Sequence, residues 1–295
     1  MSASLLIPLP GNEALCDRMA GILKFDVGDI DVRRFPDGES YVRYRASPDG
    51  KDIILVCSLD RPDEKFLPLI FAADTARELG AGSIGLVAPY LAYMRQDRRF
   101  QPGEAVTSRQ FAKLLTGAVD WLCTVDPHLH RYDGLNEIYS VPSSVGHAAP
   151  LLSHWIAREI ERPLLVGPDG ESEQWVAAVA RSANAPFIVL EKIRRGDRDV
   201  EVSDPDVQRW RDRTPVLVDD IVSTARTMIE TVRHLRHAGM KPPVCVAIHA
   251  VFSGSAYEDL RAAGVARVVT ANTVVHPSNE IDVASLLADG VREMT

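Results

Sequence analysis

Two adjacent acids follow an apolar run in the stretch VLVDDIVSTARTM, residues 216–228. The run is typical of a strand buried in a parallel sheet, and such sheets bind ligands at the carboxyl ends of their strands. Asp219 and Asp220 stand at that end. Carboxylates there can accept hydrogen bonds from vicinal sugar hydroxyls or help to hold a hydrated Mg²⁺.

The residues after these acids suit a phosphate. Ser223, Thr224 and Thr227 offer hydroxyls just where the helical spacing begins, and a helix N-terminus presents free N–H groups and a favourable dipole to an anion. Together the two halves of the stretch predict a site for a phosphorylated sugar. The alternative is that the acids and hydroxyls only cap a helix expected over 224–238.

The segment RRFPDGESYVR (33–43) predicts a turn at Pro36-Asp37-Gly38. The turn would present Phe35, Asp37 and Glu39 together. An aromatic ring with two acceptors suits adenine, whose amino group is a donor. The alternative is an ordinary hairpin turn.

In APYLAYMRQDRRF (88–100), Arg95, Arg98 and Arg99 follow a predicted strand. Guanidinium groups make forked contacts with phosphate oxygens. A solvated charge run is an equal alternative for Arg98 and Arg99.

In VDPHLHRYDG (125–134), His128 and His130 stand two residues apart after a strand end. The spacing fits metal binding or simple packing, and no further zinc ligands match it. Asp169, in GPDGESE after the predicted strand 163–167, is a second candidate metal ligand through a carboxylate oxygen or a bound water.

The segments 95–106 and 191–213 are the most polar and are rich in Arg and Asp. They predict solvated loops or loops that close over a phosphorylated substrate. Within LEKIRRGDRDVEV (190–202), Lys192 and Arg194 point the same way if the segment is extended, as a triphosphate would require.

Two nucleotide motifs are excluded. Gly80, Gly82 and Gly85 match G-x-G-x-x-G, but they end a predicted helix and lead into a strand, whereas the dinucleotide motif opens a helix. No G-x-x-x-x-G-K-[ST] sequence is present, so the chain is not a P-loop kinase.

Short apolar runs alternate with segments of helical spacing throughout the chain, which predicts an α/β fold with parallel sheets. The expected strands are 52–57, 83–89, 121–125, 163–167, 187–190, 215–219, 243–251 and 266–271. The expected helices are 66–80, 108–117, 173–183, 228–239 and 283–291. A strand–helix–strand unit occurs at 52–89 and again at 215–251, so we expect a duplicated α/β domain joined near 145–150.

The composition sets limits on function. The 295 residues carry a formal charge of −8, which argues against nucleic-acid binding. No segment is long and apolar enough to span a membrane and the N-terminus is unlike a signal peptide, so a cytoplasmic enzyme is expected. Cys57, Cys123 and Cys245 lie in or beside apolar runs and are expected in the core.

The stretch 216–228 resembles the ribose-phosphate motif of the phosphoribosyltransferase-like fold. The other five segments, in the same order, resemble those of the ribose-phosphate pyrophosphokinase family, and the forms GPDGESE and LEK-x-R are closer to its archaeal-type branch. The resemblance runs from about residue 5 to the C-terminus. It implies two duplicated phosphoribosyltransferase-like domains, each a mainly parallel sheet flanked by helices: 1–147 with the ATP-contacting segments, and 148–295 with the ribose 5-phosphate loop and the catalytic flexible loop.

The resemblance also implies a reaction, in which the pyrophosphoryl group of Mg-ATP passes to the anomeric hydroxyl of ribose 5-phosphate, giving 5-phosphoribosyl 1-pyrophosphate and AMP. By resemblance, each group of site residues then has a role. These are catalysis by Lys192 and Arg194, ATP binding by Phe35, Asp37, Glu39, Arg95 and Gln96, ribose 5-phosphate binding by Asp219, Asp220, Ser223, Thr224, Ala225, Arg226 and Thr227, and Mg²⁺ binding by His128 and Asp169. The FPDGE residues would reach the ATP of a neighbouring subunit, which implies a dimer or larger homo-oligomer.

One departure bears on activity. The family commonly has glycine where this chain has Ala225 and Arg226. A catalytically impaired regulatory paralogue, which binds nucleotides or the active enzyme, and a phosphoribosyltransferase therefore stand as alternatives. Retention of Lys192, Arg194, His128 and Asp169 argues against the first. The ATP-contacting segments argue against the second.

Overall fold

The computed structural model describes residues 3–168, 173–190, 192–195, 199–202 and 207–295. It divides the chain into two compact units. Unit 1 comprises Met1–His147, Thr273–Val275 and Val283–Thr295, and unit 2 comprises Ala148–Asn272 and His276–Asp282. Within the described ranges, no helix combines the length and the apolar composition needed to cross a bilayer.

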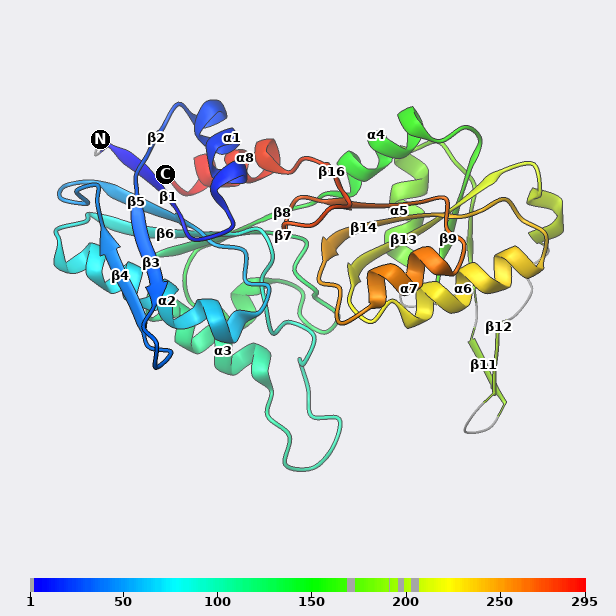
Figure 1. Ribbon diagram of the computed structural model, residues 1–295, viewed down its shortest axis with the longest axis horizontal. Coiled ribbons are helices and arrows are strands. Elements are labelled where there is room, and N and C mark those ends of the chain that lie inside the picture. Colours follow the sequence, from blue (N-terminus) through cyan, green and yellow to red (C-terminus); the bar gives the residue numbers. More distant parts are fainter. Residues whose placement is uncertain (1–2, 169–172, 191, 196–198, 203–206) are drawn as a thin grey trace. The chain divides into compact units, whose positions relative to one another are not determined.

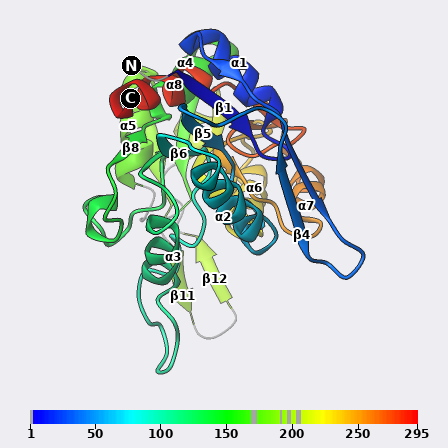
Figure 2. The ribbon, with the colours of Figure 1, turned by 90° about the vertical axis from the view of Figure 1, so that its left-hand side faces the viewer.

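Unit 1 is a six-stranded parallel sheet with helices on both faces (Figures 1 and 2). In spatial order, its strands are β2 (Asp26–Val27), β1 (Ser4–Pro8), β5 (Asp52–Val56), β6 (Ser83–Ala88), β7 (Trp121–Val125) and β8 (Ser143–Gly146). One face carries α1 (Glu13–Leu23) and α8 (Ala284–Met294), and the other carries α2 (Pro62–Glu78) and α3 (Thr107–Thr116). A hairpin of β3 (Ile30–Arg34) and β4 (Ser40–Tyr44) packs on α2, and a 3₁₀ turn spans Leu135–Glu137.

Unit 2 repeats this plan. Its parallel strands, in spatial order, are β10 (Phe187–Val189), β9 (Pro163–Gly167), β13 (Thr214–Val222), β14 (Val244–Ala250), β15 (Arg267–Ala271) and β16 (Asn279–Ile281). In Figure 1 its helices α4 (Ala149–Glu159) and α5 (Glu173–Ser182) cover one face, and α6 (Arg226–His237) and α7 (Ala256–Ala262) cover the other. A hairpin of β11 (Lys192–Arg195) and β12 (Asp199–Val202) and a 3₁₀ turn at Val207–Trp210 complete it.

The two sheets correspond strand by strand. In each, the first strand lies beside the second on one side and beside the strand that follows the hairpin on the other. The hairpins β3–β4 and β11–β12 stand at the same place in the two repeats, between the second strand of the sheet and the third. The predicted duplication of an α/β domain with parallel sheets is therefore confirmed.

The helices that close the two repeats are exchanged. Helix α4 follows the last strand of unit 1 but packs on α5 and β16 of unit 2, whereas α8 follows the last strand of unit 2 but packs on α1, β7 and β8. The units thus differ from the expected ranges 1–147 and 148–295 in the place of α8. The physical reason is a close fit: a Cβ at Gly290 of α8 would stand 2.5 Å from Cys123 Sγ, and Ser144 Oγ donates to Glu293 at 2.7 Å.

The central sheet contributes much of the hydrophobic core of each unit. Strands β7 and β14 are buried along their whole length, as their unbroken apolar sequences predict. All four cysteines are buried and unpaired. Burial raises the pKa of Cys57 and of Cys123 to about 12, so these thiols stay protonated and act as core residues, as expected.

Candidate functional site

The two acids of the ribose-phosphate stretch lie at a topological switch point. From β9 the chain proceeds outward to β10, and from β13 it proceeds in the opposite direction to β14, so the direction reverses between β9 and β13. Open α/β sheets bind ligands outside the carboxyl ends of strands at such a point. Asp219 and Asp220 are half-buried residues of β13 at that end, with Asp219 paired in register with Ala247 of β14.

Strand β13 continues to Val222, three residues beyond the predicted strand, so the acids belong to the strand and not to a helix cap. The Asp220 N–H donates to Asp219 Oδ1 at 2.9 Å, and the Ile221 N–H donates to Asp220 Oδ1 at 2.8 Å. These contacts fix the start of the loop. The helix begins at Arg226 rather than at 224, and its N-cap residue is Ala225, whose side chain makes no capping hydrogen bond. Simple capping therefore does not explain the acids.

Ala225 has the left-handed backbone conformation, with φ of 55°. This region favours glycine, because a Cβ crowds the backbone there. The Ala225 methyl group is buried in the hydrophobic cluster beneath α6, with Met228 and Val232. Ala225 thus makes the left-handed turn that glycine would make easily, and the alanine side chain packs into the core.

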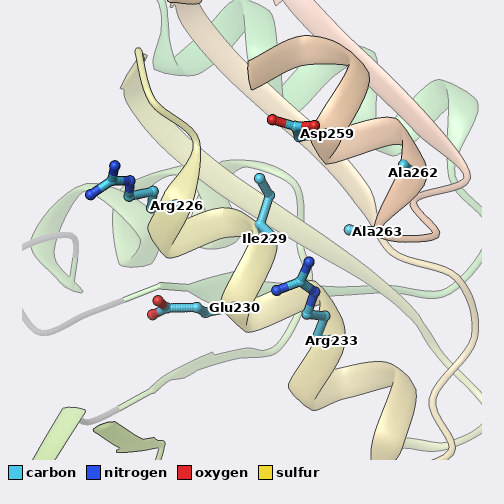
Figure 3. A pocket seen from close by; sticks show the side chains of 7 residues that line it. All are labelled: Arg226, Ile229, Glu230, Arg233, Asp259, Ala262 and Ala263. Atoms are coloured by element: carbon cyan, nitrogen blue, oxygen red, sulfur yellow. The ribbon is translucent and has the colours of Figure 1, made fainter. Parts of the chain in front are cut away.

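Arg226, the second departure, is exposed at the start of α6. It borders a surface pocket of about 430 Å³ between α6 and α7 (Figure 3). The pocket is lined by Arg226, Ile229, Glu230, Arg233, Asp259, Ala262 and Ala263. Of these only Arg226 belongs to the ribose-phosphate stretch, and in Figure 3 its guanidinium extends away from Ile229 and Arg233. This pocket is therefore distinct from the carboxyl end of β13.

The switch point of unit 1 lies between β1 and β5, and side chains that follow these strands hydrogen-bond to one another and to the backbone there. Asn12 is buried, accepts from the Ser58 N–H at 2.8 Å and donates to Leu9 O at 3.0 Å. Lys65 Nζ donates to Ser58 O at 2.9 Å and pairs with Asp60. Helix α2 begins with Pro62, which has no N–H to offer a phosphate. Unit 1 therefore has the same strand, turn and helix as the ribose-phosphate stretch of unit 2, but without the two adjacent acids of its strand end.

The FPDGE residues form the tip of the β3–β4 hairpin. The Phe35 N–H donates to Glu39 O at 2.8 Å, the Gly38 N–H donates to Phe35 O at 2.9 Å, and Gly38 has φ of 94°. Phe35 is 39% exposed, and both Asp37 and Glu39 are exposed beside it. The turn therefore presents all three predicted residues on one surface.

Arg33 lies over one face of the Phe35 ring. The Arg33 guanidinium lies 4.6 Å from the centroid of Phe35 and 4.2 Å from that of Tyr41. An exposed aromatic ring held rigidly in this way suits stacking on a planar ligand.

The predicted phosphate contacts of unit 1 lie in the segment between β6 and α3. Arg95 is exposed, and Gln96 Oε1 accepts from Thr107 Oγ1 at 3.2 Å. Arg98 stacks on Phe100 and Arg99 donates to Glu104 O at 2.9 Å, so both are engaged in their own loop.

His128 follows the carboxyl end of β7, and its ring centroid lies 4.2 Å from that of His130. Asp126, the first residue of this turn, has φ of 33° and contacts His147, with Asp126 Oδ1 3.0 Å from His147 Nδ1. This hydrogen bond raises the pKa of His147. Across the described ranges, no group of three or more His, Cys, Asp and Glu side chains could hold a metal ion. The second predicted ligand, Asp169, lies outside the described residues.

Lys192 and Arg194 lie two positions apart in β11, in register with Val202 and Val200 of β12. The polar sequence predicts a loop here, whereas the structure has a paired hairpin. Alternating Ile193, Val200 and Val202 explain the pairing, because β-branched residues favour strands.

The structure also shows a group that the sequence reasoning missed. Asp97 is buried, and its carboxylate accepts two hydrogen bonds from Arg131 NH1 at 2.8 and 2.9 Å. Tyr132 is buried beside it. The only signal in the sequence was the acid between arginines in RQDRR, which also fits a solvated charge run.

Comparison with known proteins accounts for the whole chain. Residues 5–118 match the N-terminal domain of ribose phosphate pyrophosphokinase, and residues 134–285 match the phosphoribosyl transferase domain. The ribose-phosphate pyrophosphokinase of Methanopyrus kandleri is 34% identical over 94% of this chain and 95% of its own length. That of Methanothermobacter thermautotrophicus is 31% identical over 98% of this chain and all of its own. Both relatives are archaeal, as the resemblance predicts.

A solved structure agrees with the sequence matches. Phosphoribosylpyrophosphate synthetase from Mycobacterium smegmatis superposes with a TM-score of 0.86 at 26% identity, covering 99% of each chain. Family models, relatives and structure point to the same group of enzymes across both units. The chain therefore belongs to the ribose-phosphate pyrophosphokinase family, and it is a pyrophosphoryl-transferring enzyme of that family.

Proposed function

We propose that the enzyme transfers the β,γ-pyrophosphoryl group of Mg-ATP to ribose 5-phosphate. The anomeric hydroxyl oxygen bonds to the β-phosphorus, the bond from that phosphorus to the oxygen bridging to the α-phosphorus breaks, and AMP leaves with that oxygen. The hydroxyl proton passes to solvent. The observation that carries the proposal is the half-buried acid pair at the switch point of unit 2, followed by a left-handed turn into α6.

In this proposal, unit 2 holds the sugar. Asp219 and Asp220 accept from the ribose hydroxyls. The hydroxyls of Ser223, Thr224 and Thr227 and the first N–H groups of α6 bind the 5-phosphate. Ala225 provides the turn and Arg226 adds positive charge. The acids lie in a central strand, Arg226 and Thr227 lie in a helix, and a loop of three residues joins the two elements, so little reorganisation is needed on binding.

ATP binds through unit 1. Arg95 and Gln96 contact the phosphates, while Phe35 stacks on adenine and Asp37 and Glu39 accept from its amino group. These last three would come from a neighbouring subunit, so the enzyme would work as a dimer or larger homo-oligomer. The exposed, rigidly held Phe35 supports that role.

Mg²⁺ would be held by His128 and Asp169 together with the phosphates of ATP. Magnesium usually takes one or two protein ligands and completes its shell with phosphates and water, so a sparse donor set fits it. When bound, the ion neutralises charge on the phosphates. Lys192 and Arg194 would meet the charge that develops on the transferred group.

The decisive experiment is product analysis with purified protein, Mg-ATP and ribose 5-phosphate. We expect AMP and phosphoribosyl pyrophosphate in equal amounts, with none formed when ribose 5-phosphate is omitted. Formation of ADP would contradict intact pyrophosphoryl transfer. A regulatory paralogue would bind ATP without forming AMP. A phosphoribosyltransferase would instead consume phosphoribosyl pyrophosphate and a base without needing ATP.

A further inference from the structure

The segment that carries Arg95 and Gln96 is fastened to its neighbours at several points. Gln96 O accepts from the Ser108 N–H at 3.3 Å, and its side chain accepts from Thr107, so the first turn of α3 holds this residue. Tyr93 has φ of 62° and its hydroxyl donates to Asp63 at the start of α2. Fastening on both sides of Arg95 limits the positions that this exposed side chain can reach.

A third fastening joins the segment to the turn that carries His128. Asp97 has a side chain only 2% exposed, and both of its oxygens accept from Arg131 NH1. A buried carboxylate needs a partner of opposite charge, because burial removes its hydration. Arg131 is that partner, and it lies three residues after His128.

Tyr132 reinforces the same junction. Its hydroxyl donates to Asp97 O at 3.3 Å, lies 3.1 Å from Ser108 Oγ and accepts from Arg109 Nε at 3.3 Å. One buried hydroxyl therefore connects the Asp97 segment, the first turn of α3 and the His128 turn. Such a hub couples the positions of the three elements, since moving any one breaks a hydrogen bond.

We propose that Arg131 and Tyr132 are positioning residues for ATP, which fix Arg95 and Gln96 relative to His128. This inference rests on the proposed function. The ion pair does two things. It sets the distance between the phosphate-contacting segment and the metal-contacting turn. It also engages the carboxylate of Asp97, two residues from Arg95, so that Asp97 does not neutralise the charge that Arg95 offers to phosphate.

The chain contains a matched control. Arg77 and Asp120 form another arginine–aspartate pair in unit 1, with N–O distances of 3.2 and 3.1 Å. Its arginine is 39% exposed, against 42% for Arg131, but its aspartate is 43% exposed, against 2% for Asp97, so the control matches the arginine and not the burial of the acid. Asp120 precedes β7 and Arg77 lies at the end of α2, so this pair is at the amino end of β7 and has no link to the proposed ATP contacts.

The test compares Arg131→Met, Arg131→Lys and Tyr132→Phe with Arg77→Met. We expect Arg131→Met to raise the KM for Mg-ATP by about tenfold or more, because it removes the charge-assisted hydrogen bonds of one guanidinium nitrogen to both oxygens of a buried carboxylate. The KM for ribose 5-phosphate should change less than about twofold, since that substrate binds in unit 2. Arg131→Lys should recover part of the loss, and Tyr132→Phe should give a smaller effect in the same direction.

Two direct measurements complete the test. Calorimetric binding of α,β-methylene ATP, whose scissile position cannot react, should weaken in Arg131→Met and not in Arg77→Met. The double variant with Arg131→Met and Asp97→Asn should lose little more affinity for the analogue than Arg131→Met alone, because the two residues act as one unit. Equal binding of the analogue by both arginine variants would overturn the inference.

Hydrogen exchange separates this inference from the proposed function. In ligand-free protein, amides of residues 94–98 should exchange faster in Arg131→Met than in the wild type, and at an unchanged rate in Arg77→Met. Unchanged exchange in Arg131→Met would overturn the positioning role, whatever the enzyme catalyses. If the wild type formed no AMP and bound no analogue while exchange rose as expected, the proposed function and the ATP role would fail together, leaving only a structural junction.

Discussion

At the scale of single residues, Ala225 decides whether the ribose-phosphate loop can form without its usual glycine. An alanine in the left-handed region costs about 1 kcal/mol relative to glycine. Packing of its methyl group in the cluster beneath α6 offsets part of that cost. The same conformation occurs at Arg61, with φ of 52°, at the equivalent N-cap of α2 in unit 1. The turn is therefore a property of the fold, and glycine is one of several residues that can occupy it.

We expect Ala225→Gly to leave the free energy of unfolding within about 1 kcal/mol of wild type, because relief of strain and loss of a buried methyl nearly cancel. Ala225→Val should destabilise by about 1–3 kcal/mol and weaken ribose 5-phosphate binding, since a β-branched residue is strongly disfavoured there. Urea unfolding measures the stability of each variant, and calorimetry measures its affinity for ribose 5-phosphate. As a control, Arg61→Gly should leave that binding unchanged. A large gain in affinity for Ala225→Gly would show that the alanine does obstruct the phosphate.

Lys192 and Arg194, two of the three charged residues of β11, give a second prediction at this scale. Lys192→Ala and Arg194→Ala should each lower kcat by about 10²-fold or more, if each acts as an electrostatic donor to the transferred group. Ribose 5-phosphate affinity should change little. Arg195→Ala, one position further along the strand with no assigned role, is the control. A raised KM at unchanged kcat would instead identify a residue that binds substrate and transition state equally.

At the scale of elements, the same turn serves two purposes in the two units. In unit 2, the strand end at the switch point carries half-buried acids and the following helix starts with an N–H-bearing residue. In unit 1, the residues after the corresponding strands contact one another: Asn12 accepts from the Ser58 N–H, and Lys65 donates to Ser58 O and pairs with Asp60. The polar groups at this strand end of unit 1 are thus satisfied by the chain itself, whereas the corresponding strand end of unit 2 carries two half-buried acids.

Helix α8 supplies the prediction at this scale. Gly290→Ala should destabilise unit 1 by about 1–3 kcal/mol, because the new Cβ overlaps Cys123 Sγ in a buried contact. Gly21→Ala in α1 is the matched control. A Cβ there meets nothing within 4 Å, and alanine favours a helix, so this variant should be neutral or stabilising. Thermal unfolding of both variants decides. Equal stability of the two would mean that α8 adjusts to the extra methyl group.

The sequence predicts the central elements well and the peripheral ones poorly. Runs such as DIILVC and PVLVD are apolar enough to indicate buried strands on their own. Strands β8 and β16 are short and polar, so they form only because a neighbouring strand offers partners. The place of α8 depends on a fit between Gly290 and residues more than 140 positions away, which local periodicity does not contain.

The site was predictable to the extent that its chemistry is local. Asp219, Asp220 and the FPDGE turn are contiguous motifs, and the structure places each at a strand end or hairpin tip. The Asp97–Arg131 pair joins residues 34 positions apart and has no motif of its own. Tertiary packing buries the Asp97 carboxylate, and this burial makes its ion pair with Arg131 important for stability.

At the scale of the whole molecule, the proposed sharing of an ATP site between subunits would require more than one copy of the chain. Phe35, Asp37 and Glu39 lie at a hairpin tip in unit 1, while Lys192 and Arg194 belong to the equivalent hairpin of unit 2. If the first hairpin serves the ATP of a neighbouring subunit, each active site needs residues from two chains. Mutations in the two hairpins should then complement each other.

We expect mixed oligomers of Glu39→Ala and Lys192→Ala subunits to regain activity that neither variant has alone. In a closed symmetric assembly with random mixing, about a quarter of the sites would combine two intact contributions. Activity after joint refolding, compared with the variants refolded separately, measures this. Mixing Lys192→Ala with Arg194→Ala is the control, because both changes lie in one hairpin. No recovery in the first mixture would favour a site built within a single chain.

The exchange of α4 and α8 between the units also has a consequence for biosynthesis. Helix α8 is translated after all of unit 2, so the β7–β8 face of unit 1 stays bare while the ribosome makes the remaining half of the protein. Unit 2 needs only elements from α4 to β16 and can close first. The earlier-made unit is therefore the later to mature. The apolar strand β7, uncovered on this face, is a natural place for a nascent-chain chaperone to bind during that interval.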